Sequence, residues 1–474
     1  MTSDILGPFL TLDTVDGDQM RLAALFVVPQ GVELPPVQLG AEALPAQTLT
    51  QIDTVSVQRV RFSVPAGGSS HYHWNGTDYA LAGGLGGDMR IAFASCNGEE
   101  HGDLDRDLAE RNVMWTRLGR AHQAAPFAVL LHGGDQIYAD EVTLGHHLSH
   151  DWPDKAPKDP ARADLEELRD HLRRGFLQRY CALLADPDFA WLCARVPSLA
   201  QWDDHDICDG WGSLQRSRTY SPVGQALFEV AREMALLFQH GTVDGDLPAR
   251  FHDPKGTHLG WHVDTPGLRL IAPDLRSERT RRQVMGPGGW AMMEDIAKKE
   301  APQHTLIVSS VPLLGPRLSV LETLLVITPR MQKYEDDLRD QWQSRAHRDE
   351  WRRMLRLVCD MMHAKGTDVT VLSGEIHLAT RATMDAGQGR VLHQLVASGI
   401  THRAPPNAWA RVLGALAAFG EGPLPGQRIK IQRIPGRKQR YIAERNALVV
   451  QRSGAQWQAV WDFEQAGLSE PLDL

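Results

Sequence analysis

The sequence lacks an apolar run long enough to cross a membrane. Although 42% of its 474 residues are hydrophobic, no stretch approaches the run of about 18 apolar residues that indicates a transmembrane helix. The first residues, MTSDILGPFLTLD, contain no basic segment, no twin arginine and no long apolar core, so they do not resemble a secretory signal. We therefore expect a cytoplasmic protein that does not associate with membranes.

The sequence also has few cysteines, and it has fewer basic than acidic residues. The five cysteines are scattered without the CxxC spacing of many zinc sites, and their odd number argues against a disulfide framework. Lysine and arginine number 50 against 59 aspartate and glutamate residues, which gives a net charge of −9. A negative chain has no general attraction for phosphate backbones, so we expect no nucleic-acid scaffold role. No feature of the sequence indicates an oligomeric state.

The chain contains two successive regions with different sequence patterns. Residues 1–88 contain β-branched runs at 20–28 and 57–64 and no helical periodicity, which predicts an N-terminal β-rich, sandwich-like domain. The glycine-rich stretch 81–88 closes this region. Residues 89–474 alternate apolar runs with amphipathic segments, which predicts an α/β domain with buried sheets.

The α/β region contains seven short apolar runs that we interpret as buried strands. These runs are RIAFASC, FAVLLHG, SLAQWDD, LRLIAPDLR, TLIVSS, DVTVLSGE and LHQLVASG. Helices are predicted over 104–122 and 349–365, and two closing strands over 446–452 and 455–464. In such folds the chemistry gathers at the carboxyl ends of the strands.

The polar residues at these strand ends have the composition of a metal site. They are Cys96 and Asn97, Asp135 with Tyr138 and Asp140, the run Asp203–Asp206, and Glu375 with His377. We expect them to converge on one edge of one sheet, where carboxylate and phenolate oxygens suit a hard cation. Each of these elements, taken alone, also has a purely structural interpretation. Cys96 could be a small core residue, GGDQIYAD a turn that opens a helix, and SGEIH a strand end with a surface glutamate. WDDHD resists such a reading, because four adjacent ionisable groups repel one another without a cation or a proton.

The blocks ASCN, GDQIYAD, WDDHD and LSGEIH, in this order, resemble the alkaline phosphatase D-like (PhoD-like) branch of the calcineurin-like metallophosphoesterases. The segments Asp274–Arg276, Gln283–Gly286, Ala397–Thr401 and Tyr441–Asn446 also fit that family. The resemblance implies two facing mixed sheets flanked by helices, preceded by a β-sandwich. It also implies hydrolysis of phosphomonoesters, phosphodiesters or both at a site with Fe³⁺ and Ca²⁺, where Zn²⁺ or Mn²⁺ is an alternative at the second position.

The resemblance assigns roles to individual residues. It places Cys96, Asp135, Tyr138 and His377 around iron, and Asp135, Asp204 and Glu375 around the second metal, with Asp135 as the bridge. It makes His205 the active-site histidine, and Arg276 and Asn97 contacts of the phosphate. Independently of the resemblance, Asp206 directly follows His205 and is expected to orient its ring. Two such cations lower the pKa of a bound water towards about 7, so that hydroxide attacks phosphorus. His205 is expected either to contact the phosphoryl oxygen or to protonate the leaving oxygen.

Tyr138 and Cys96 also bear on the identity of the first metal. A phenol has an ordinary pKa of about 10, so only a strongly Lewis-acidic, hard cation such as Fe³⁺ is expected to hold Tyr138 as phenolate at neutral pH. Thiolate binds iron well and calcium hardly at all.

This chain departs from the family pattern at three places. Glu375 replaces the usual aspartate of LSGDxH, a twin-arginine signal is absent, and residues 140–197 contain a charged insertion that is expected to shape substrate access. Two other functions stay open from the sequence. One is a catalytically weak scaffold or phospholigand-binding protein on the same fold, and the other is a metallohydrolase that acts on a non-phosphate ester.

Overall fold

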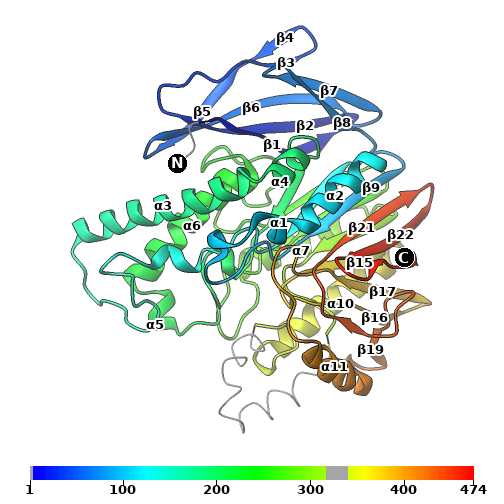
Figure 1. The fold of residues 1–474 in the computed structure, drawn as a ribbon. Helices are drawn as coiled ribbons and strands as arrows, with labels where there is room; N and C mark the ends of the chain where they lie inside the picture. Colours follow the sequence, from blue (N-terminus) through cyan, green and yellow to red (C-terminus); the bar gives the residue numbers. More distant parts are fainter. Residues whose placement is uncertain (1–3, 316–339) are drawn as a thin grey trace.

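The computed structural model describes residues 4–315 and 340–474, which form a mixed α/β structure (Figure 1). Two large mixed sheets and one small antiparallel sheet make up its β structure. The apolar runs that we interpreted as buried strands all lie in the two large sheets. The expected fold class, two mixed sheets with helices outside and a β-rich N-terminal region, is confirmed.

The first large sheet has eleven strands, and its middle carries three of the predicted strand ends. In sheet order the strands are β23 (Gly467–Leu468), β22 (Gln456–Phe463), β21 (Asn446–Ser453), β9 (Met89–Ala94), β10 (Val129–Gly133), β11 (Ser198–Gln201), β1 (Leu6–Asp16), β2 (Gln19–Pro29), β6 (Val55–Pro65) and β5 (Ala46–Ile52), with β24 (Leu472–Asp473) beside β22. The strands β9, β10 and β11 are parallel. They are buried almost throughout, as expected of strands covered on both faces.

The second large sheet has nine strands. They are β12 (Trp261–Thr265), β13 (Leu268–Ala272), β14 (His304–Val308), β15 (Asp368–Ser373), β17 (Arg390–Val396), β16 (Ala379–Gly387), β19 (Gln427–Gln432) and β18 (Glu421–Leu424), with β20 (Tyr441–Ile442) beside β16. The hairpin β18–β19 lies in a stretch rich in proline, glycine and arginine, residues 420–440, where the sequence analysis placed no strand. Its strand β19 alternates buried Ile429 and Ile431 with exposed Arg428 and Lys430, which is the pattern of a half-buried strand.

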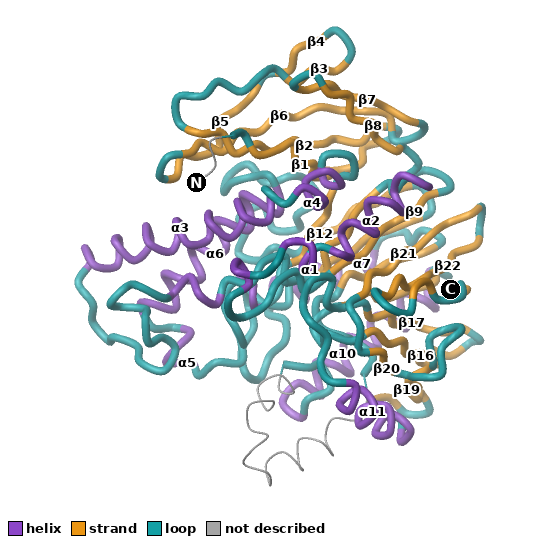
Figure 2. The backbone as a smooth tube through the Cα atoms, viewed as in Figure 1, coloured by secondary structure: helices purple, strands orange, loops and turns teal. Residues whose placement is uncertain are grey.

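The N-terminal region shares a sheet with the rest of the chain. Its four-stranded sheet is β4 (Glu42–Leu44), β3 (Val37–Leu39), β7 (Ser69–Trp74) and β8 (Thr77–Ala82), drawn at the top of Figure 2. Its other strands extend the first large sheet, because β1 pairs in parallel with β11 through Thr11 and Ser198. The buried Arg59 of β6 also donates to the carbonyl oxygen of Gly241 at 3.1 Å. The boundary that we predict at residue 88 therefore divides a continuous sheet.

The helices lie outside the large sheets (Figure 1). They are α1 (Leu108–Arg111), α2 (Val113–Ala124), α3 (Arg162–Leu184), α4 (Pro187–Cys193), α5 (Arg216–Thr219), α6 (Pro222–His240), α7 (Pro287–Lys298), α10 (Arg348–Lys365) and α11 (Asn407–Leu416). The helix predicted over 104–122 is interrupted at Asn112, which ends α1 and caps α2. Among the helices that the structure describes, none is both long and apolar enough to cross a membrane.

Candidate metal centre

The four predicted strand ends meet between two sheets and not at the edge of one. Cys96, Asp135 and Asp204 follow β9, β10 and β11 of the first sheet, whereas Glu375 follows β15 of the second. The two sheets approach closely here, because Ser95 Oγ donates to the carbonyl oxygen of Ala397 at 2.9 Å. The expectation of a single sheet edge was therefore wrong. The seven apolar runs have similar compositions, so the sequence does not show which of the two sheets each strand joins.

The backbone is strained at the residues that carry the candidate ligands. Cys96, Asp135, Glu375 and His377 all have positive φ angles, between 51° and 68°. Such conformations cost free energy in residues other than glycine and cluster at functional sites. Gly134, just before Asp135, also has a φ of 108°, and a Cβ there would lie 2.7 Å from Cβ of Asp203. The strand ends are thus held in shapes that serve side-chain placement and not ordinary turn geometry.

Two groups of metal-competent side chains share the Asp135 carboxylate. In the first group the ligand atoms of Cys96, Asp135 and His377 lie within 4.8 Å of one another, and in the second those of Asp135, Asp203 and Asp204 do. Asp135 is 1% exposed, and its Oδ1 has no hydrogen-bond partner among the described residues. An unpartnered buried carboxylate oxygen is costly unless a cation or proton meets it. The donor set therefore fits a pair of cations with Asp135 between them.

Tyr138 completes the first group. Its hydroxyl oxygen lies 3.0 Å from Nε2 of His377 and 3.4 Å from Oδ2 of Asp135. The Sγ of Cys96 lies 3.2 Å from the hydroxyl of Ser398, which also accepts the backbone N–H of His377 at 2.8 Å. Phenol, thiol, imidazole and carboxylate thus face one point, and Ser398 fixes two of the strand ends that carry them.

The electrostatics of the cluster favour a cation. Burial, followed by the nearby carboxylate of Asp203, raises the pKa of Asp135 well above its ordinary value. Burial together with the neighbouring groups Cys96 and Asp135 likewise raises the pKa of Tyr138. Burial and Asp135 raise the pKa of the Cys96 thiol. Negative charge in this cluster is therefore unfavourable without a compensating positive charge, which a bound metal ion supplies.

His205 is oriented by a different aspartate from the one we predicted. Its Nδ1 lies 2.9 Å from Oδ2 of Asp140. Asp206 instead accepts the backbone N–H groups of Asp135 and Asp203, both at 2.9 Å. Burial opposes a charge on His205, but the carboxylates of Asp140 and its neighbours outweigh it and raise the pKa of the ring well above its usual value. Asp206 thus holds two strand ends together, and the orienting role belongs to Asp140.

Arg276 is buried among carboxylates and does not offer its guanidinium to a substrate. Its side chain is fully buried and paired with Asp203 and Asp340, and its Nη2 lies 3.2 Å from Oδ1 of Asp204. Its Nη1 also donates to the carbonyl oxygen of Trp211 at 3.1 Å. The expected phosphate contact is therefore replaced by a structural one. The positive charge of Arg276 compensates the negative charges of these buried carboxylates.

Asn97 is also engaged within the protein. Its Nδ2 donates to the carbonyl oxygen of Gln136 at 3.1 Å, and its Oδ1 accepts the indole N–H of Trp115 at 2.9 Å. The side chain is 4% exposed. The expected contact with phosphate is thus not available to this amide, which joins the ends of β9 and β10.

Glu375 lies close to the cluster without joining either ligand group. Its Oε2 accepts the side-chain amide of Gln341 at 2.8 Å. Burial and the carboxylates of Asp340 and Asp203 raise its pKa well above the ordinary value. The group of carboxylates around Asp135 contains Asp203 and Asp204, whereas the sequence led us to expect Asp204 and Glu375. The longer arm of the glutamate turns towards Gln341 in this arrangement.

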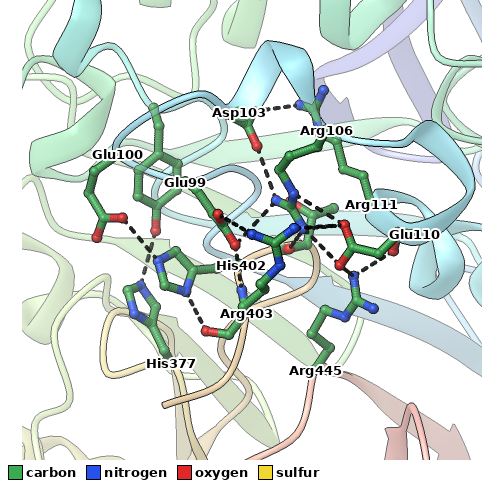
Figure 3. A network of polar contacts seen from close by, with 12 residues as sticks. Glu99, Glu100, Asp103, Arg106, Glu110, Arg111, His377, His402, Arg403 and Arg445 are labelled. Carbon is green, nitrogen blue, oxygen red and sulfur yellow. Dashed lines mark hydrogen bonds and ion pairs between the residues drawn. The ribbon is translucent and has the colours of Figure 1, made fainter. Parts of the chain in front are cut away.

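A histidine that was not among the predicted residues, His402, lies beside the candidate ligands. The ring of His402 stacks on that of His377, with 3.5 Å between centroids, and its Nε2 lies 3.4 Å from Oε2 of Glu100. Figure 3 shows both rings next to Glu100 and to a network of arginines and acids. His402 directly follows the Ala397–Thr401 block, and its backbone N–H donates to the carbonyl oxygen of Cys96 at 3.2 Å.

The polar network drawn in Figure 3 fixes the loops around the centre. Arg106 pairs with Asp103 at 3.1 Å and donates to the carbonyl oxygen of Thr401 at 2.8 Å. Arg445 pairs with Glu110 at 3.0 Å. These contacts connect the loop after β9 with the loop after β17 and with the start of β21. They explain how residues far apart in the sequence hold Cys96 and His402 side by side.

Comparison with known proteins agrees with this architecture. The chain is 22% identical over 447 aligned residues to the uncharacterized protein YGR266W of Saccharomyces cerevisiae, and the match covers 75% of this chain. It covers 62% of the yeast protein, so this chain spans about three-fifths of that relative. A solved structure titled "Structure of PhoD" superposes with a TM-score of 0.60 at 12% identity, over 98% of this chain and 88% of that one. At this identity the superposition shows a shared fold.

A family profile gives the decisive match. It is described as "PhoD related phosphatase" and covers residues 93–334, just over half of the chain. This range begins in β9 and includes the strand ends that carry Cys96, Asp135 and Asp204. The chain belongs to the PhoD-related phosphatase family.

Proposed function

We propose that this protein is a metal-dependent hydrolase of small phosphoesters, acting on monoesters, diesters or both. The observation that carries the proposal is the position of Asp135, whose carboxylate belongs to both groups of candidate ligands. A shared carboxylate is the usual means of holding two cations close enough to act on one phosphoryl group. Family membership agrees with the proposal but does not establish activity.

The donor types support different metals at the two positions. Cys96, Tyr138 and His377 would hold Fe³⁺ together with Asp135, because phenolate and thiolate favour a strongly Lewis-acidic cation. Asp135, Asp203 and Asp204 offer only carboxylates, which suit Ca²⁺, although Zn²⁺ or Mn²⁺ is an alternative there. When bound, such ions polarise the phosphoryl oxygens and make a coordinated water acidic enough to supply the nucleophile.

The protein's own side chains would position the substrate and protonate its leaving oxygen. Nδ1 of His205 is bonded to Asp140, so Nε2 is the ring atom left to serve the substrate. We propose that Nε2 donates a proton to the oxygen of the leaving alcohol, a role worth roughly 10²- to 10⁴-fold in rate. Tyr138 stacks on the same ring with 4.3 Å between centroids, which limits its rotation. Arg276 contributes by pairing with Asp203 and Asp204 and so holding both carboxylates in place.

The direct test is hydrolysis of p-nitrophenyl phosphate and bis-p-nitrophenyl phosphate by the purified protein. A phosphoester hydrolase releases p-nitrophenol from one or both, and loses this activity on dialysis against a chelator. Readdition of the metals restores it. A folded, metal-loaded protein that cleaves neither compound would overturn the proposal and would leave a phospholigand-binding role on the same fold.

A further inference from the structure

A pocket lies between helix α10 and the hairpin β18–β19, with a volume of about 480 Å³. Arg352, Arg356, Gln427 and Arg428 supply its polar lining, and Pro423 and Leu424 supply apolar surface. None of the residues that line it belongs to the candidate metal centre. Figure 1 places α10 and β19 in the lower part of the molecule, near α11. The pocket is therefore a separate feature of the second sheet.

Three arginines line this pocket and no acidic residue does. Arg352 and Arg356 are four residues apart on α10, so their side chains extend from the same face of the helix. Arg428 comes from the exposed face of β19, and both it and Arg356 are exposed. The side chain of neither arginine has a hydrogen bond or an ion pair with any residue in 4–315 or 340–474. Two full positive charges thus stand at the pocket, and no acidic side chain of the described residues pairs with either of them.

The third arginine is fixed in place but hardly neutralised. Nε of Arg352 donates to the carbonyl oxygen of Pro423 at 3.0 Å, which holds the guanidinium against the hairpin. Its acidic neighbour Asp349 is 3.6 Å away and its side chain is fully exposed, so the pair contributes little. The nearby Glu421 is engaged elsewhere, since it pairs with Arg348 at 3.2 Å.

We propose that this pocket binds an organic diphosphate. Arginine presents a planar fork of donors that matches phosphate oxygens, and three such forks around one cavity suit a group with several negative charges. The proline and leucine walls offer apolar contact to the organic part. The volume lies within the range of roughly 300–1,000 Å³ that is usual for small-molecule sites. The site is distinct from the proposed catalytic centre, which would act on its phosphoester through metals.

The experiment uses methylenediphosphonate, whose P–C–P bridge resists hydrolysis, and isothermal titration calorimetry on the full chain. Because this probe also binds metal ions, the Asp135→Asn variant serves as the background, and Asp204→Asn as a second background if the first does not fold. In either background we expect one binding event at the arginine pocket. Adding Arg356→Gln and Arg428→Gln should weaken it at least tenfold. The matched control Arg120→Gln, an exposed arginine of α2, should change it less than twofold.

The alternative outcomes are distinct. If the folded background variant does not bind the probe, the pocket has no affinity for it and the pocket proposal is wrong. It is also wrong if the two pocket substitutions leave the affinity unchanged while the thermal unfolding midpoint shows a folded protein. Neither result bears on the hydrolysis of p-nitrophenyl phosphate by the wild type, which tests the proposed function separately.

Discussion

The imidazole of His205 is held by the carboxylate of Asp140, with Nδ1 3.1 Å from Oδ1 and 2.9 Å from Oδ2. Asp140 Oδ1 also accepts the backbone N–H of Asp209 at 2.7 Å, so the carboxylate itself is fixed. The ring is confined on one face by Tyr138. Asp140 opens the region 140–197, for which we predicted a part in substrate access. In the structure its first residue reaches back to orient a candidate catalytic group.

Replacing Asp140 by asparagine should therefore lower turnover without unfolding the protein. We expect a loss of about 10- to 100-fold in kcat on alkyl phosphates, as for a misdirected general acid. The loss should be smaller on p-nitrophenyl phosphate, whose leaving group needs no proton. The comparison of kcat values for the two substrates measures this. Equal losses on both would show that Asp140 does not act through proton donation by His205.

Asp206→Asn is the matched control for Asp140→Asn. It should lower the stability of the protein and not change the difference in kcat between the two substrates. The Asp206 carboxylate accepts the backbone N–H of Ile137 at 3.2 Å and the side-chain amide of Gln239 at 2.9 Å, besides its two bonds to the strand ends. Loss of charge and of one acceptor should lower the free energy of unfolding by about 1–3 kcal/mol. Urea denaturation measures it. A variant as stable as the wild type would contradict the structural role.

Arg276→Ala should be strongly destabilising. It leaves Asp203, Asp204 and Asp340 buried without their shared cation, and breaking a buried ion pair costs about 3–5 kcal/mol. Urea denaturation should show the loss, whereas Arg120→Ala should leave the midpoint in place. An Arg276→Ala protein of normal stability with only a raised KM would restore the role of Arg276 as a phosphate contact.

The purified protein should be coloured if iron is bound by Tyr138 and Cys96. Phenolate and thiolate bound to Fe³⁺ absorb visible light by charge transfer, and Tyr138→Phe and Cys96→Ser each remove one donor. The band should move or vanish in each variant, as absorption spectra at matched protein concentration would show. A colourless, fully active enzyme without iron would contradict the assignment.

His304 should make the protein less stable in acid. Burial lowers its pKa from 6.5 to about 3, so the folded state keeps a neutral ring while the unfolded chain takes up a proton below pH 6.5. Its contribution is complete above pH 6.5 and is lost as the pH falls towards 3, by up to about 1.4 kcal/mol per pH unit. Urea denaturation of His304→Gln should show a shallower loss of stability between pH 6 and 4. Parallel pH profiles for the two proteins would contradict this.

The sequence predicted which residues gather at the centre better than how they are used. The blocks after β9, β10 and β11 carry adjacent, chemically distinctive residues, so Cys96, Asp135 and Asp204 could be found without a structure. The role of Arg276 could not, because its partner Asp340 lies 64 positions further along the chain and no local pattern connects them. His402 was missed for a similar reason, since a lone histidine after a strand carries no signal until its stacking on His377 is seen.

The fold shows the same division between local pattern and long-range contact. Apolar runs predicted the buried strands, since a strand covered on both faces is apolar along its length. They could not tell that β1 adds to the sheet of β11, because that contact rests on one pairing between Thr11 and Ser198. Nor did composition predict β19, where prolines and glycines surround a strand of only six residues.

The most direct test of the account is the metal content of Asp135→Asn beside that of the wild type. Because this carboxylate belongs to both ligand groups, its loss should weaken both metals together. Elemental analysis of the purified, folded proteins should find two metals per wild-type chain and less than half of each in the variant, with p-nitrophenyl phosphate hydrolysis below a tenth of the wild-type rate. A folded variant that keeps both metals and more than a tenth of the activity would contradict the bridging role of Asp135.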